Sequence, residues 1–154
     1  MRRTDREVTD ATAITAIMER CKVVRLAINT DAAPYILPLN FGMESDGMTI
    51  YIHGAAEGEK YHLLQRDGRV GFEMDCMLGM DMDEVHRECS TRYESVVGWG
   101  VAEEITDLEE KRHALKRMMA QYQRADFPFS EGPLPRTRIF CIRVQQRTGK
   151  SRTV

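Results

Sequence analysis

The sequence has no apolar run that approaches the length of a membrane span. Its first residues, Met-Arg-Arg-Thr-Asp-Arg-Glu, are too polar to lead into a secretory signal. Both features predict a cytoplasmic protein with no membrane partner. At 154 residues the chain is long enough for one hydrophobic core and too short for two, so we expect a single domain over residues 1–154.

The chain also lacks an excess of either charge. Its 22 Lys and Arg residues nearly balance 24 Asp and Glu residues, giving a formal net charge of -2. Because acidic and basic residues are interleaved, no basic patch suited to nucleic acid or to an anionic membrane is evident. We therefore expect no nucleic-acid partner, and an enzyme or a small-molecule-binding domain is favoured.

Cysteine is scarce, and no CxxC pair occurs. The four residues are Cys21, Cys76, Cys89 and Cys141. In a reducing compartment scattered cysteines of this kind are expected to be free thiols. Cys76 and Cys89 lie near His86, but the spacing differs from that of a standard zinc site, so we expect no metal. The motifs GxSxG, GxGxxG and the P-loop are also absent, which leaves hydrolase, Rossmann and NTPase interpretations without support.

Hydrophobic spacing predicts three helices and about six strands with hairpin-like connections. The helices are expected over 10–20, over 57–66 with Gly68 as a C-terminal cap, and after a capping box at 106–109. The strands are expected over 23–29, 35–44, 48–53, 69–75, 92–105 and 137–145. Pro38 favours an edge strand or a bulge, and residues 76–91 have little periodicity, which favours a loop. These elements predict a mainly β protein that forms a small antiparallel barrel with peripheral helices.

The densest cluster of candidate site residues lies between Tyr51 and Lys60. A strand ends at His53, small residues follow, and a helix begins with Lys60 in its first turn. Helix starts expose unpaired N–H groups and bind phosphate, and a lysine adds a full positive charge. Taken alone, one lysine at one helix start is a weak signal, and this pattern is more typical of a solvated surface lysine and a polar residue at a strand end.

Two further clusters carry polar groups on strands. Asn40 alternates with Leu39 and Phe41, so its amide faces away from them and can bind the edge of a heterocycle or simply face water. The hydroxyls of Thr91, Tyr93 and Ser95 share one face of the 92–105 strand region, where they can line a polar site or form ordinary cross-strand pairs.

Taken in order, these clusters resemble the 5-nitroimidazole resistance (Nim) group of the pyridoxamine-phosphate-oxidase-like proteins. The resemblance covers nearly the whole chain, from the first seven residues to Thr148-Gly-Lys150. The segments that carry it are Arg25-Leu-Ala27, Pro34-Tyr35, Pro38-Leu-Asn-Phe-Gly42, His53 with Glu57-Gly58 and Lys60, and Tyr93-Glu-Ser-Val-Val-Gly98.

The resemblance implies an FMN-binding split β-barrel that forms a homodimer, with FMN in grooves between the subunits. By position, Lys60 and the turn before it correspond to the phosphate site, and His53 and Gly54 to a wall of the flavin groove. Leu39 and Asn40 correspond to the strand beneath the isoalloxazine ring. Ser95, with Tyr93 on the same strand, corresponds to the contact made by the other subunit.

The function implied is that of an FMN-dependent oxidoreductase that reduces nitroaromatic or related small aromatic substrates. His53 is the candidate proton donor, because an imidazole changes charge near neutral pH. The alternative is a non-catalytic module that holds a flavin or a haem for storage or sensing. The sequence departs from the family in having Glu59 where a second basic residue is common. No segment of the sequence resembles the carboxy-terminal extension that serves vitamin B6 oxidation, so we do not expect that activity.

Overall fold

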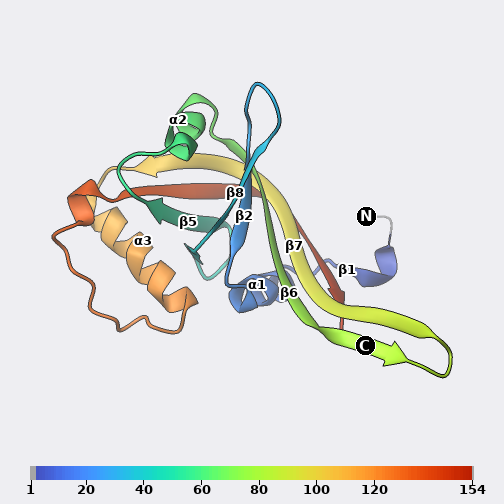
Figure 1. Cartoon of the computed structure of the whole chain (residues 1–154). Helices are drawn as coiled ribbons and strands as arrows, with labels where there is room; N and C mark the ends of the chain where they lie inside the picture. Colours follow the sequence, from blue (N-terminus) through green and yellow to red (C-terminus); the bar gives the residue numbers. More distant parts are fainter. Residues whose placement is uncertain (1–2, 154) are drawn as a thin grey trace.

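A single antiparallel sheet of eight strands forms most of the molecule, with three α-helices packed around it, in a computed structural model that describes residues 3–153 (Figure 1). Met1 and Arg2, which belong to the amino-terminal segment of the resemblance, lie outside the described residues, as does Val154. The strands are β1 (Glu7–Val8), β2 (Val24–Ile28), β3 (Tyr35–Leu39), β4 (Phe41–Met43), β5 (Thr49–Gly54), β6 (Arg69–Asp83), β7 (Glu88–Ile105) and β8 (Arg138–Arg152). The helices are α1 (Ala11–Arg20), α2 (Glu59–Arg66) and α3 (Leu108–Gln121), with 3₁₀ turns at Thr4–Arg6 and Leu134–Arg136. The predicted fold class, mainly β with three helices, is confirmed.

The strand order shows how the sheet curls into a half-barrel. The order is β3-β2-β6-β7-β8-β5-β4, with β1 pairing β8 beyond this path. Strands β3 and β4 therefore lie at opposite edges, yet only Asn40 separates them along the chain. The sheet must bend until its two edges meet at that residue. The predicted strand over 35–44 is thus two strands, and Pro38 lies in the edge strand β3, where the missing N–H does least harm.

The core fills the concave side of the sheet. Strands alternate buried and exposed positions, as in β2, where Val24, Leu26 and Ile28 are fully buried. Helix α1 covers this core with Ile17 and Met18, which lie on the face that the helical spacing predicts. Helix α3 packs on β4 and β5 and forms a smaller cluster there. Among residues 3–153, no helix is long and apolar enough to span a membrane.

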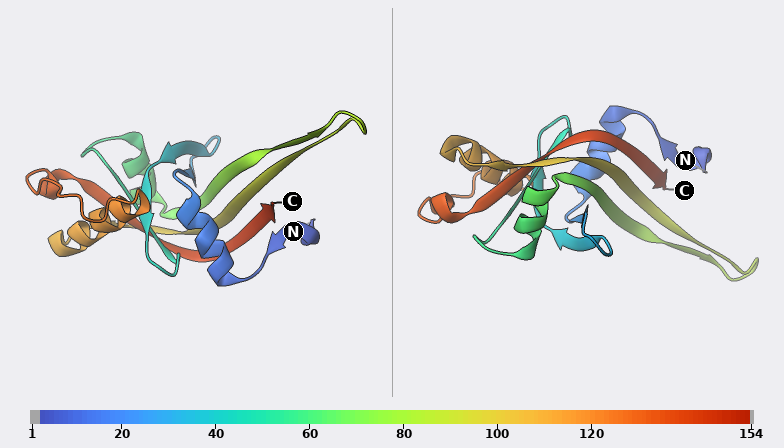
Figure 2. Two further views of the ribbon diagram at one scale, coloured as in Figure 1. Left: turned by 90° about the horizontal axis from the view of Figure 1, so that it is seen from below. Right: turned by 90° about the horizontal axis from the view of Figure 1, so that it is seen from above.

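Strands β6 and β7 continue far beyond the barrel as a two-stranded ribbon (Figure 2). Their pairing runs from Arg69↔Val101 to Asp83↔Glu88, with a bulge between Met77 and Gly79. The expectation of a loop over 76–91 is therefore wrong. Both faces of the ribbon are largely exposed, so no apolar periodicity marks it, and its turn is made by Arg87 at φ 55 rather than by glycine.

Three local predictions are also corrected. The final strand runs to Arg152 rather than to residue 145. The N-cap of α3 is Asp107, whose carboxylate accepts from two backbone N–H groups, so the predicted box at 106–109 is displaced by one residue. Gly68 does not cap α2, because Asp67 takes the C-cap position in an extended conformation. A Cβ at Gly68 would instead lie 2.6 Å from the carbonyl oxygen of Ala102.

We expect Gly42→Ala to destabilise the fold by about 3 kcal/mol, the upper end for overpacking. A Cβ at this position would lie 2.6 Å from the carbonyl carbon of Arg117, inside the backbone of α3, which cannot move without leaving β4. The control is Gly132→Ala, where the nearest atom is a side-chain oxygen at 3.8 Å. Urea unfolding of both variants measures the difference, and equal midpoints would contradict this packing.

Candidate functional site

The junction between β5 and α2 brings the densest predicted cluster together. Strand β5 ends at Gly54, and α2 begins at Glu59 after Gly58, whose φ of 150 favours glycine. Among residues 3–153 no side chain caps this helix start, so its first N–H groups have no side-chain hydrogen-bond partner there. The helix begins two residues later than predicted, and Lys60 is still in its first turn.

Gly54, Lys60 and Tyr61 form the centre of this junction. A Cβ on Gly54 would collide with the Tyr61 hydroxyl and would lie 2.7 Å from the Lys60 Nζ. Tyr61 is 1% exposed, and within residues 3–153 its hydroxyl finds no hydrogen-bond partner. A buried hydroxyl that lacks a partner is unfavourable, and it is the kind of group that a bound ligand satisfies.

The electrostatics of the junction are those of an uncompensated cation. Burial lowers the pKa of Lys60, and among the described residues no carboxylate offsets its charge. Burial also lowers the pKa of His53, and the nearby Lys60 ammonium lowers it further. The fold therefore disfavours two positive charges here, and an anion bound between Lys60 and His53 would stabilise the charged form of each.

Arg138 is a further cation at the junction that the sequence analysis missed. It pairs with Gly54 in the sheet, and its guanidinium carbon lies 4.6 Å from the centre of the Tyr61 ring. Its Nε and Nη2 donate to the Glu104 carboxylate at 2.8 and 2.6 Å. The charge of Arg138 is thus already balanced. The signal that could have indicated it is its place at the start of the strand that pairs with β5.

Leu39 and Asn40 lie where the half-barrel closes. Phe41 pairs with Ile52, so Asn40 is placed opposite His53 at the end of the two strands. The Asn40 Nδ2 donates to the Tyr122 hydroxyl at 2.9 Å, which fixes the amide. Leu39 is half-buried against the core. The structure therefore brings Asn40 to the same end of the barrel as His53.

Tyr93 and Ser95 lie far from this junction within one chain. His53 pairs with Ile139, which pairs with Ile105 on β7, and Ser95 is ten residues along β7 from Ile105. At the rise of a β-strand this separation is roughly 30 Å. Tyr93 contacts Lys150, which lowers the pKa of the Tyr93 hydroxyl. One chain does not unite the predicted set of residues.

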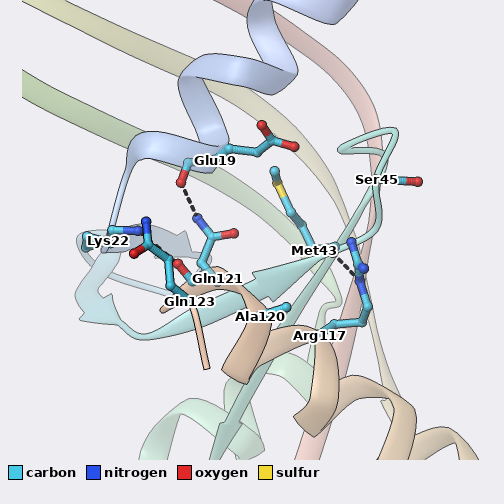
Figure 3. Close-up of a pocket in the computed structure, with 8 residues that line it drawn as sticks. All are labelled: Glu19, Lys22, Met43, Ser45, Arg117, Ala120, Gln121 and Gln123. Carbon is cyan, nitrogen blue, oxygen red and sulfur yellow. Dashed lines mark hydrogen bonds between the residues drawn. The ribbon is translucent and has the colours of Figure 1, made fainter. Parts of the chain in front are cut away.

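A cavity of about 420 Å³ lies elsewhere, between the end of α1, strand β4 and the last turns of α3 (Figure 3). It is lined by Glu19, Lys22, Met43, Ser45, Arg117, Ala120, Gln121 and Gln123, none of which belongs to the predicted set. Lys22 donates a hydrogen bond to the carbonyl oxygen of Gln121, and Arg117 donates to that of Met43, so both cations already have partners. The junction at Lys60, with its unsatisfied groups, is the better candidate site.

A curled antiparallel sheet closed through one residue, with a cationic helix start at its end, defines a split β-barrel. The chain belongs to the pyridoxamine 5'-phosphate oxidase family, which matches residues 10–151. No match was found among the curated proteins with which it was compared.

The solved structures confirm the resemblance seen in the sequence. A Bacteroides thetaiotaomicron protein proposed to give 5-nitroimidazole antibiotic resistance is 33% identical, with a TM-score of 0.80 over 94% of this chain and 85% of that one. An FAD- and haem-binding protein of Mycobacterium smegmatis (19% identity, TM-score 0.80, 95% of this chain and 73% of that one) shares the fold. So does an FAD-binding protein of Mesorhizobium loti (22% identity, TM-score 0.68, 96% and 98%).

We expect an NMR titration of the His53 ring to give a pKa below its ordinary 6.5, and Lys60→Met to raise it. The neutral ring is favoured in the fold, so stability should fall as the pH drops from 6.5 through the folded-state pKa, and His53→Gln should lose this part of the pH dependence. Lys60→Arg keeps the charge and serves as the control. A His53 pKa that is unchanged in Lys60→Met would contradict the contact.

Proposed function

We propose that this chain binds FMN, with its phosphate at the β5–α2 junction, and reduces small nitroaromatic or related aromatic substrates. The observation that carries the proposal is the Lys60 ammonium beside the Tyr61 hydroxyl at Gly54, since in the part of the chain that the structure describes the first has no carboxylate partner and the second no hydrogen-bond partner. A phosphate group is a dianion with several acceptor oxygens. It would offset the lysine charge and accept from the free N–H groups at the start of α2.

The residues at the β5–α2 junction fit FMN, the cofactor that the family suggests. Glu59 replaces a basic residue common in the family, and Glu59 is exposed. Arg138 lies on the neighbouring strand and stays paired with Glu104, so it adds little net charge. Lys60 would therefore be the main cationic contact to the phosphate, with Gly54 leaving the space that the Tyr61 hydroxyl occupies.

The proposal includes a homodimer whose second subunit completes the site. The convex face of β7 exposes Val97 and Trp99 next to Ser95, with Ile36 of β3 also exposed on the sheet. A shallow hollow of about 360 Å³ adjoins this face, lined in part by Ile36 and Gly98. A cluster of exposed apolar side chains on the outer face of a sheet favours a protein interface. A partner packed there would bring its own Lys60 junction toward Ser95 and Tyr93.

His53 is the proposed proton donor. A bound FMN would carry the electrons for reduction of a nitro group. Burial and Lys60 lower the pKa of His53 and favour its neutral form in the free protein. A phosphate dianion beside Lys60 would offset that ammonium and favour the protonated imidazole that donates the proton. The ring lies at the exposed end of β5, where a small aromatic substrate has access. Asn40, held by Tyr122, would orient the heterocycle on the adjoining strand.

The alternative function is a binding module that holds a cofactor without catalysing a reaction, and the same geometry would suit it. Such a module would hold a flavin or a haem at the same groove, and the His53 imidazole would be a suitable ligand for haem iron. Turnover separates the two functions. FMN-loaded protein that reduces a nitroaromatic in the presence of a chemical reductant supports the enzyme, and loaded protein without turnover supports the module.

We expect Lys60→Ala to weaken FMN binding about tenfold to a hundredfold, the loss of one charge-assisted contact. Riboflavin, which lacks the phosphate, should be affected much less. Fluorescence quenching titrations of both flavins give the two affinities. Lys22→Ala, which removes a lysine already bound to a backbone carbonyl, is the matched control. Equal losses for FMN and riboflavin would show that Lys60 does not contact the phosphate.

We expect the wild-type chain to sediment as a dimer that buries well over ~2,000 Å². Trp99→Asp should yield a folded monomer with strongly reduced FMN affinity, because Trp99 is 48% exposed in the single chain and belongs to the proposed interface. Leu108→Asp is the control, since Leu108 is 47% exposed on α3, away from this face. A wild-type chain that is a stable folded monomer at micromolar concentration would contradict the proposal.

A further inference from the structure

Two of the four thiols lie in contact inside the barrel. The Sγ atoms of Cys21 and Cys76 are 3.4 Å apart, although the residues are 55 positions apart in the sequence. Cys21 is the C-cap of α1 and is fully buried, whereas Cys76 on β6 is partly exposed. All four cysteines are free in the structure, as the sequence analysis expects, but these two are within reach of one another.

The fold holds the two thiols together from both sides. Helix α1 leads into β2, which pairs antiparallel with β6 and has Arg25 opposite Glu73. Following this register back along the chain brings Cys21, at the end of α1, near Cys76 on β6. The last residue of α1, Arg20, donates to the buried Glu94 carboxylate at 2.8 Å, and Glu94 is the β7 neighbour of Cys76. The end of α1 is therefore anchored on the base of the ribbon, and the contact between the thiols does not depend on a flexible segment.

We propose that Cys21 and Cys76 form an oxidisable dithiol, a modification site that hydroperoxides convert into an intramolecular disulfide. The more exposed Cys76 sulfur attacks one oxygen of hydrogen peroxide. The S–O bond forms and the O–O bond breaks, which gives a sulfenic acid, and the other oxygen leaves as water with the Cys76 proton. The Cys21 sulfur then attacks that sulfur. The S–S bond forms, the S–O bond breaks, and the hydroxyl group leaves as a second water with the Cys21 proton. Two thiols lose two electrons, and one peroxide gains them.

The order of the two steps follows from the surroundings of each thiol. Burial raises the pKa of the Cys21 thiol, with further contributions from Cys76 and the nearby carboxylates of Asp75 and Glu73. Both carboxylates accept hydrogen bonds from the Arg25 guanidinium. Cys21 thus stays protonated and unreactive until Cys76 is oxidised beside it. A nearby resolving thiol also protects Cys76 from further oxidation.

The disulfide would fix a corner on which the candidate site depends. The Gln121 amide donates to the carbonyl oxygen of Cys21 at 2.9 Å, and the Tyr122 hydroxyl donates to that of Lys22 at 2.7 Å. Figure 3 shows Lys22 and Gln121 at this corner. Tyr122 in turn accepts from Asn40. Oxidation would therefore tie together α1, β6 and the end of α3.

The test uses a Cys89→Ser chain, because Cys89 is exposed and would react by itself. After treatment with hydrogen peroxide, denatured protein should show one free thiol instead of three, an intact mass lower by about 2 Da, and one cross-linked peptide joining Cys21 to Cys76. Dithiothreitol should restore all three thiols. The oxidised chain should unfold roughly 5–15 °C higher than the reduced chain, since the bond closes a long loop.

Two further variants in the same background sharpen the result. Cys76→Ser should form no disulfide and show no rise in the unfolding midpoint, while Cys141→Ser removes a buried thiol outside the pair and should leave the cross-link intact. The inference is overturned if Cys76 is oxidised to a sulfinic acid while Cys21 stays free. It is equally overturned if the cross-link joins other cysteines or if the unfolding midpoint does not change. None of these readouts requires FMN to be bound.

Discussion

The direct passage from β3 to β4 is the constraint on which the rest of the structure depends. Asn40 is the single residue between strands that lie at opposite edges of the sheet. The Tyr122 hydroxyl holds this point by accepting from Asn40 Nδ2 and from the Phe41 N–H, and by donating to the Lys22 carbonyl. This one hydroxyl connects the end of α3, the barrel closure and the start of β2. The closure places β5, and with it Gly54, beside α2.

The same closure separates the polar groups into two sets. His53, Lys60 and Asn40 gather at one end of the barrel, while Ser95 lies roughly 30 Å away along β7 on the convex face. Among residues 3–153 the first set has a lysine with no carboxylate partner and a buried hydroxyl with no hydrogen-bond partner, and the convex face exposes apolar side chains. A second copy with a phosphate-bearing ligand would satisfy both. The pairing of these polar groups and the burial of these apolar side chains are the physical basis of the proposed function.

The sequence predicts most of the fold because hydrophobic spacing follows the barrel core closely in α1, β2 and β5. It fails over residues 76–91, where an exposed ribbon has no core face and Arg87, rather than a glycine, takes the left-handed position of the turn. In the candidate site, the position of Lys60 in the first turn of a helix is predictable because its signal is local. Tyr61 and Arg138 are not, since their roles depend on the register between β5 and β8 and on the space at Gly54, which no single segment encodes.

The most direct test of the central claim is to identify the chromophore that the purified wild-type protein releases on denaturation, after saturation with a mixture of FMN, FAD, riboflavin and haem. Chromatography with mass detection gives its identity and its ratio to protein. The account predicts FMN at one molecule per chain, because only a terminal phosphate meets the free Lys60 ammonium and the start of α2. FAD or riboflavin in preference to FMN, haem, or no chromophore would contradict it.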